Sequence, residues 1–215
     1  YQHEIEKLIC KNVKNKMTFF TGYDCDSLAM EPITNFISDF VPFFRRYKNV
    51  LFEIRTKSVN NTVFRKHDAL SNCIVAYSLM PETLAQKLDK KAPSVSARIK
   101  NMKYIVKKGW KVGLRFDPLI YCNNWKAEYA KLFANIFKEI KDENIHSISL
   151  GPLRFPNSFF NKLLQYYPKT EEFSFLRSNE KGIVSYDQTI ESEMNEYCRL
   201  ELMKYSEARK FFSCG

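Results

Sequence analysis

Short apolar runs recur along the chain, and longer segments of mixed polarity separate each run from the next. A run of this length, bounded by polar or turn-forming residues, is typical of a β-strand. Five strands are predicted in this way. They are expected at Met17–Thr21, Val50–Ile54, Cys73–Leu79, Lys111–Phe116 and His146–Leu150.

The segments between these strands carry apolar side chains every three or four residues, which predicts amphipathic helices. The strongest such pattern runs from Trp125 to Ile140. Another, from Ile33 to Phe44, predicts a helix that Pro32 starts and Pro42 bends. Further helices are expected before Gly109, which is suited to ending a helix, and over about Asn157–Tyr166.

The C-terminal quarter of the chain has a different pattern. Two short strand-like segments, Phe173–Arg177 and Ile183–Tyr186, flank a polar stretch that contains Gly182 and predict a β-hairpin. The remainder, to about Phe212, is predicted to be helical.

Alternating strands and helices imply right-handed βαβ units and a parallel sheet covered by helices. Five units do not fill an eight-stranded barrel, so an open sheet and a partial barrel both remain possible. In either case the loops after the strands hold the chemistry. We expect one α/β core over residues 1–168, followed by a hairpin and helix extension over 169–215.

Composition adds a preference for an anionic partner. The 34 lysines and arginines exceed the 24 aspartates and glutamates, giving a net charge of +10 and a pI near 9.2. Nucleic-acid binding and the lysine bias of AT-rich genomes explain this excess equally well.

The six cysteines show no CxxC spacing, so free thiols in a reducing cytosol are the favoured interpretation. The first residues form a polar helical run without the apolar region of a signal peptide, and no stretch is apolar enough to span a membrane. We therefore expect a cytoplasmic protein. Because Tyr1 lies within this helical run, we also expect upstream residues to belong to the functional protein.

Polar residues follow the predicted strands, where a parallel sheet would place its functional side chains. The sequence contains no Walker loop, GxGxxG, HExxH or GxSxG motif, and its histidines are isolated. Each polar residue taken alone has an ordinary structural interpretation, as a solvated lysine, a helix cap or a turn former. The set is Asp24-Cys25-Asp26, Thr56-Lys57-Ser58, Tyr77-Ser78, Asp117 and Arg154.

Several of these segments together resemble the spore photoproduct lyase family of radical SAM proteins, which act through S-adenosylmethionine (SAM). The resemblance runs in order from about Met17 to Pro168, following the family's second to sixth barrel strands. Trp125 and Tyr129 match the helix after the fifth strand. The matching segments are Thr21–Pro32 (TGYDCDSLAMEP), Phe52–Ser58 (FEIRTKS), Tyr77–Leu79 (YSL), Gly109–Ile120 (GWKVGLRFDPLI) and Ser149–Pro156 (SLGPLRFP).

This resemblance implies a partial (β/α)6 radical SAM barrel that lacks its first strand. In the family, that strand and its loop carry a CxxxCxxC motif whose thiolates hold a [4Fe–4S] cluster. The cluster binds SAM and cleaves it reductively to a 5′-deoxyadenosyl radical. The 215 residues contain no such motif, so no cofactor is expected on this chain alone.

The resemblance also assigns candidate site residues. Lys57 matches a family lysine that contacts SAM, Ser78 matches a family serine, and Cys25 stands where the family has a serine. Tyr23 occupies the position at which true photoproduct lyases carry a hydrogen-donating cysteine, so it is a candidate catalytic residue, and the substitution leaves thymine-dimer repair open.

A hairpin near residues 173–186 contacts DNA in the family. Here Arg177 and Lys181 lie beside the aromatic Phe175 and Tyr186, which suits phosphates and unstacked bases. The alternative is a solvated turn whose aromatic side chains pack inward.

Our interpretation is a portion of a radical SAM enzyme, expected to act as a monomer on DNA. The alternatives are a non-catalytic nucleic-acid-binding module that keeps the barrel, and a radical SAM enzyme with a small substrate.

Overall fold

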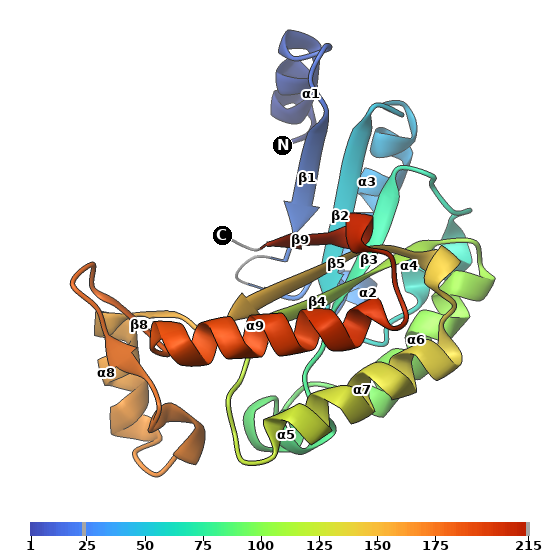
Figure 1. The fold of residues 1–215 in the computed structure, drawn as a ribbon. Helices are drawn as coiled ribbons and strands as arrows, with labels where there is room; N and C mark the ends of the chain where they lie inside the picture. The colour runs from blue at the N-terminus through green and yellow to red at the C-terminus, as the bar shows by residue number, and fades with distance from the viewer. Residues whose placement is uncertain (23–24, 214–215) are drawn as a thin grey trace.

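The structure, a computed structural model, describes residues 1–22 and 25–213. A six-stranded parallel sheet with strand order β1-β2-β3-β4-β5-β9 dominates it (Figure 1). The first five strands follow one another in sequential order, which confirms the predicted succession of parallel strands. Their bounds are β1 Met17–Thr21, β2 Val50–Thr56, β3 Cys73–Ser78, β4 Lys111–Leu119 and β5 Ile145–Pro152.

Helices cross over between the strands and cover one face of this half-barrel. In Figure 1, α6, α7 and α9 lie next to one another below the strands. Outward-facing side chains of the sheet pack beneath the helices. Tyr77 of β3 is one of them, and its hydroxyl accepts a 2.7 Å hydrogen bond from Asn101 of α6. The helices are α1 Gln2–Lys11, α2 Glu31–Thr34, α3 Phe36–Arg45, α4 Thr62–Lys66, α5 Glu82–Leu88, α6 Val95–Lys107, α7 Trp125–Glu139, α8 Asn157–Tyr166 and α9 Gln188–Met203.

The helical segment after β1 breaks at Asn35, a break that the sequence did not predict. Asn35 adopts a left-handed conformation with φ 50°, which ends α2 and begins α3. The buried Glu31 carboxylate accepts the backbone N–H groups of Ile37 and Ser38, both at 2.9 Å. This capping satisfies the free N-terminus of α3 and fixes the break, while Pro42 lies within the continuous α3.

A three-stranded antiparallel sheet with order β6-β8-β7 follows the half-barrel. Its strands are β6 Phe155–Pro156, β7 Arg177–Ser178 and β8 Ile183–Ser185, and α8 stands beside it. The β7–β8 pairing confirms the predicted hairpin with a shorter first strand, because Phe173 belongs to a 3-10 helix, η2 (Glu171–Phe173).

The chain ends back on the main sheet. After α9, the 3-10 helix η3 (Ala208–Lys210) leads into β9 (Phe211–Ser213), which pairs in parallel with β5. The prediction that helix continues to about Phe212 was therefore wrong. Both sheets combine residues from before and after position 168, because β6 pairs with β8 and β5 pairs with β9. Within the described ranges, no helix has the length and apolarity needed to cross a membrane.

Candidate active site

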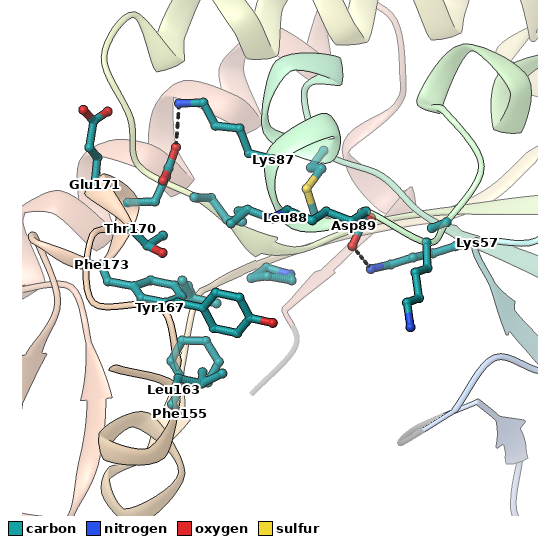
Figure 2. A pocket seen from close by; sticks show the side chains of 18 of the residues that line it. Lys57, Lys87, Leu88, Asp89, Phe155, Leu163, Tyr167, Thr170, Glu171 and Phe173 are labelled. Carbon is teal, nitrogen blue, oxygen red and sulfur yellow. Dashed lines mark hydrogen bonds and ion pairs between the residues drawn. The ribbon is translucent and has the colours of Figure 1, made fainter. Parts of the chain in front are cut away.

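A cavity of about 1220 Å³ lies at the C-terminal ends of the strands. Its lining includes Ile120 after β4 and Leu153 after β5. In Figure 2, Lys57 and Asp89 lie on one side, and Tyr167 and Phe173 lie on the other. The volume exceeds the roughly 300–1,000 Å³ that is usual for small-molecule pockets. This strand-end cavity therefore has room for a cofactor and a second group.

Asp26 connects the loop after β1 to the end of β2. Its Oδ1 accepts hydrogen bonds from the backbone N–H groups of Leu28 and Ala29 and from the Thr56 hydroxyl, at 2.8 to 2.9 Å. Its Oδ2 accepts the backbone N–H of Lys57 at 2.6 Å. Since one carboxylate holds both segments, the backbone from which Lys57 projects is fixed.

The Lys57 side chain lines the cavity and forms an ion pair there with Asp89. Its Nζ lies 2.6 Å from Asp89 Oδ1, and Asp89 Oδ2 accepts a 2.9 Å hydrogen bond from Arg98. Arg98 is fully buried and also donates to the carbonyls of Pro93, at 2.9 Å, and Ser78, at 3.0 Å. Arg98 thus connects the end of β3 to the loop that presents Asp89, and Asp89 orients Lys57.

The predicted SAM residues are not all brought together. Lys57 lines the strand-end cavity, whereas Cys25 and Ser78 are not among the described residues that line it. Cys25 is exposed, and Ser78 is half-buried with its carbonyl bound by Arg98. Tyr23 lies outside the described residues.

The hairpin residues face in different directions. The Arg177 guanidinium folds back on its own turn, donating to the carbonyls of Ser174 at 2.7 Å and Leu176 at 2.8 Å. Lys181 is exposed. Tyr186 is buried, and its hydroxyl accepts the backbone N–H of Tyr121 at 2.9 Å. The hairpin therefore does not present Tyr186 to a partner.

The inner face of the half-barrel carries an ionic network, of which sequence reasoning singled out Asp117 alone. Glu53 of β2 pairs with Arg115 of β4 at 2.7 Å and with Arg55 at 2.8 Å. Asp117 lies 3.8 Å from Arg55 and accepts a 3.2 Å hydrogen bond from Ser149 of β5. Burial would raise the pKa of Glu53, but hydrogen bonds and charge from Arg115 and Arg55 hold that pKa below its ordinary value.

A sequence signal for this network existed. Strand residues two apart point to the same face of a sheet. Polar residues stand two apart within or just after three of the predicted strands: Glu53 and Arg55, Arg115 and Asp117, and Ser147 and Ser149.

The residues present do not fit an iron–sulfur cluster. Among residues 1–22 and 25–213, no group of three or more His, Cys, Asp or Glu side chains is arranged to hold a metal ion. Such a cluster requires several thiolates at one place. A SAM molecule is a better match, because Lys57 offers an ammonium group for a carboxylate inside a cavity of sufficient volume.

A half-barrel of parallel strands with a cavity at their C-terminal ends defines the class: an open α/β barrel. A family model for spore photoproduct lyase matches residues 3–182. The chain therefore belongs to the spore photoproduct lyase family. A search of curated proteins finds no significant match.

Solved structures of spore photoproduct lyase share this fold. One variant with bound SAM and dinucleoside spore photoproduct superposes with a TM-score of 0.83 at 15% identity. A second structure, complexed with the dinucleoside spore photoproduct, gives 0.83 at 13% identity, and another variant gives 0.84 at 14%. In each comparison 99% of this chain is covered, and the chain spans 64% of the length of the matched protein.

Proposed function

We propose that this chain forms the SAM-binding and DNA-facing portion of a radical SAM enzyme. The observation that carries the proposal is Lys57, whose ammonium group lines the strand-end cavity and is oriented by Asp89 and Arg98. In the proposal, Lys57 binds the carboxylate of SAM, while Asp89 keeps the ammonium group at the cavity wall. Ser78 and Cys25 remain secondary candidates at the neighbouring strand ends.

The cluster of the family is assigned to residues outside these 215, because the chain lacks both the CxxxCxxC motif and a metal-holding group among its described residues. We therefore assign to this chain only the binding and orientation of SAM and of the substrate.

The proposed substrate is DNA, with repair of a pyrimidine photoproduct as the specific reaction. Family membership, the net charge of +10 and the volume of the cavity support this choice. Solved structures of spore photoproduct lyase hold SAM and the dinucleoside spore photoproduct. The second candidate is a nucleic-acid-binding module without SAM chemistry, which the net charge of +10 also supports.

Equilibrium dialysis with SAM and with decarboxylated SAM tests the role of Lys57. The wild-type chain should bind SAM more tightly than the decarboxylated compound, by roughly 3- to 10-fold, since the ion pair is only partly shielded from water. Lys57→Ala should abolish this preference, whereas Lys107→Ala, an exposed lysine at the end of α6, should retain it.

Two results would count against the proposal. Equal binding of both compounds by the wild-type chain would remove Lys57 from carboxylate recognition. Nucleic-acid binding with no SAM binding at all would favour the non-catalytic module.

A further inference from the structure

One wall of the strand-end cavity is aromatic. Along the sequence that forms it, acidic residues appear only at Glu171 and Glu172. Phe155, Phe160 and Phe173 pack against one another with ring centroids 5.6 to 6.0 Å apart. Tyr167 lines the cavity beside them at the end of α8, and 54% of its surface remains exposed. An exposed tyrosine in the same cavity wall as a packed aromatic cluster offers a flat surface.

The charge around this wall is positive. Between Glu143 and Glu171 the sequence contains no acidic residue but has three cations, Arg154, Lys162 and Lys169. Lys169 is exposed and lines the cavity close in sequence to Tyr167. No ion pair holds Lys169 within the part of the chain that the structure describes.

The opposite rim carries two more exposed cations, Lys90 and Lys91, which follow Asp89 directly. The carboxylate of Asp89 is already engaged by Lys57 and Arg98. Neither Lys90 nor Lys91 forms an ion pair with any described residue. Both rims of the cavity thus present lysines that have no partner among those residues.

A second ion pair neutralises the far end of the cavity. Glu172 is 4% exposed and pairs with Lys87 of α5 at 3.1 Å, joining the two walls (Figure 2). Asp89 and Glu172 are therefore paired, while Glu171 is exposed and lines the cavity beside Glu172. The three lysines Lys90, Lys91 and Lys169 outnumber this one carboxylate, so the mouth keeps an excess of positive charge.

We propose that the mouth of the cavity binds a single-stranded segment of nucleic acid, with one base stacked on Tyr167 and phosphates bound by Lys90, Lys91 and Lys169. Bases in a duplex are stacked on one another, so a free base face is needed to contact an exposed ring. Flat side chains next to cations are the composition that such binding uses. This inference rests on the proposed DNA substrate and assigns its recognition to the cavity mouth instead of the hairpin.

Fluorescence anisotropy of a short labelled oligothymidylate, at several salt concentrations, tests this assignment on the 215-residue chain. Tyr167→Leu should weaken binding by roughly 5- to 100-fold, as expected for loss of one base–aromatic stack. The matched control is Tyr166→Leu, which alters the neighbouring exposed tyrosine that does not line the cavity.

The lysines are tested in the same way with a control of equal charge. The double variant Lys90→Ala/Lys91→Ala should flatten the slope of log K against log salt by about 1.4, or about 0.7 per phosphate contact. The control, Lys107→Ala/Lys108→Ala, removes the same charge from two exposed residues at the end of α6. These residues precede the start of β4 and do not line the cavity, so the slope should stay unchanged. Thermal melting of every variant verifies that the fold is retained.

Binding by the wild type with equal losses in the mouth variants and their controls would overturn the assignment while leaving the proposed function intact. Stronger loss from Arg177→Ala/Lys181→Ala than from the mouth variants would return recognition to the hairpin. Absence of any salt-dependent binding by the wild type would reject the DNA substrate itself.

Discussion

Arg98 connects the stability of the fold to the orientation of the site, and replacing it with methionine tests this link. Its guanidinium is fully buried and donates to two backbone carbonyls and to Asp89. Arg98→Met preserves an unbranched apolar stem but leaves these three acceptors without their donor. Removing one partner of a buried ion pair costs about 3–5 kcal/mol. Because Lys57 still pairs with Asp89, the lower end of that range, about 3 kcal/mol, is expected.

Urea denaturation followed by tryptophan fluorescence measures this loss, because Trp110 and Trp125 are both buried. The expected destabilisation corresponds to a fall in Tm of about 6–12 °C for a domain of this size. Arg199→Met, at an exposed position of α9, is the control and should change the free energy of unfolding by less than about 0.5 kcal/mol.

A double variant separates the ion pair from general packing. Arg98→Met/Asp89→Asn should be more stable than the sum of its single variants predicts, by about 1–3 kcal/mol, because neither charge is left buried without the other. Strict additivity, or an Arg98→Met variant as stable as the Arg199 control, would refute the role assigned to Arg98.

Two further perturbations test other parts of the structure. Glu53→Gln removes the charge that pairs with Arg115 and Arg55. Because the pKa of Glu53 is lowered in the folded protein, its carboxylate stabilises the fold at neutral pH, and this stabilisation is lost as the pH falls through that pKa. In urea unfolding, the wild type should therefore have a higher free energy of unfolding than Glu53→Gln at about pH 7, and this difference should shrink below about pH 4. A difference that does not change with pH would contradict the prediction. Gly22→Ala should destabilise by about 1–3 kcal/mol in thermal melts, since φ is +80° and a Cβ would lie 2.6 Å from the Arg55 carbonyl oxygen. Gly182→Ala, with φ +73° and nothing within 4 Å of its Cβ, should cost less, and equal losses would exclude the clash.

The five long strands could be predicted because their signal is local. Each is an apolar run followed by turn-forming residues, and burial between helices requires that composition. The strand β9 could not be predicted in this way, because Phe211–Ser213 is too short to show a period and its partner β5 lies more than fifty residues earlier. The break at Asn35 was not predicted, because it depends on the carboxylate of Glu31 capping the next helix, a contact that hydrophobic periodicity does not register.

The site residues likewise fall into those that the sequence indicated and those that only the fold brings together. Lys57 was a candidate because it follows a strand and matches a lysine of the family, and it lines the cavity. Asp89 was missed because it follows a helix, 32 positions from the lysine that it orients. The Glu53–Arg115 pair spans 62 positions, so only the fold brings the two side chains together. Local patterns thus predicted the strands and the family resemblance pointed to Lys57, while the partners that orient Lys57 depend on tertiary contacts.

A crystal structure of this chain with SAM tests the central claim most directly. The account predicts SAM in the strand-end cavity, with its carboxylate within hydrogen-bond distance of Lys57 Nζ and Arg98 still bound to Asp89. SAM bound elsewhere on the chain, with the Lys57–Asp89 pair unaltered and the cavity empty, would contradict it.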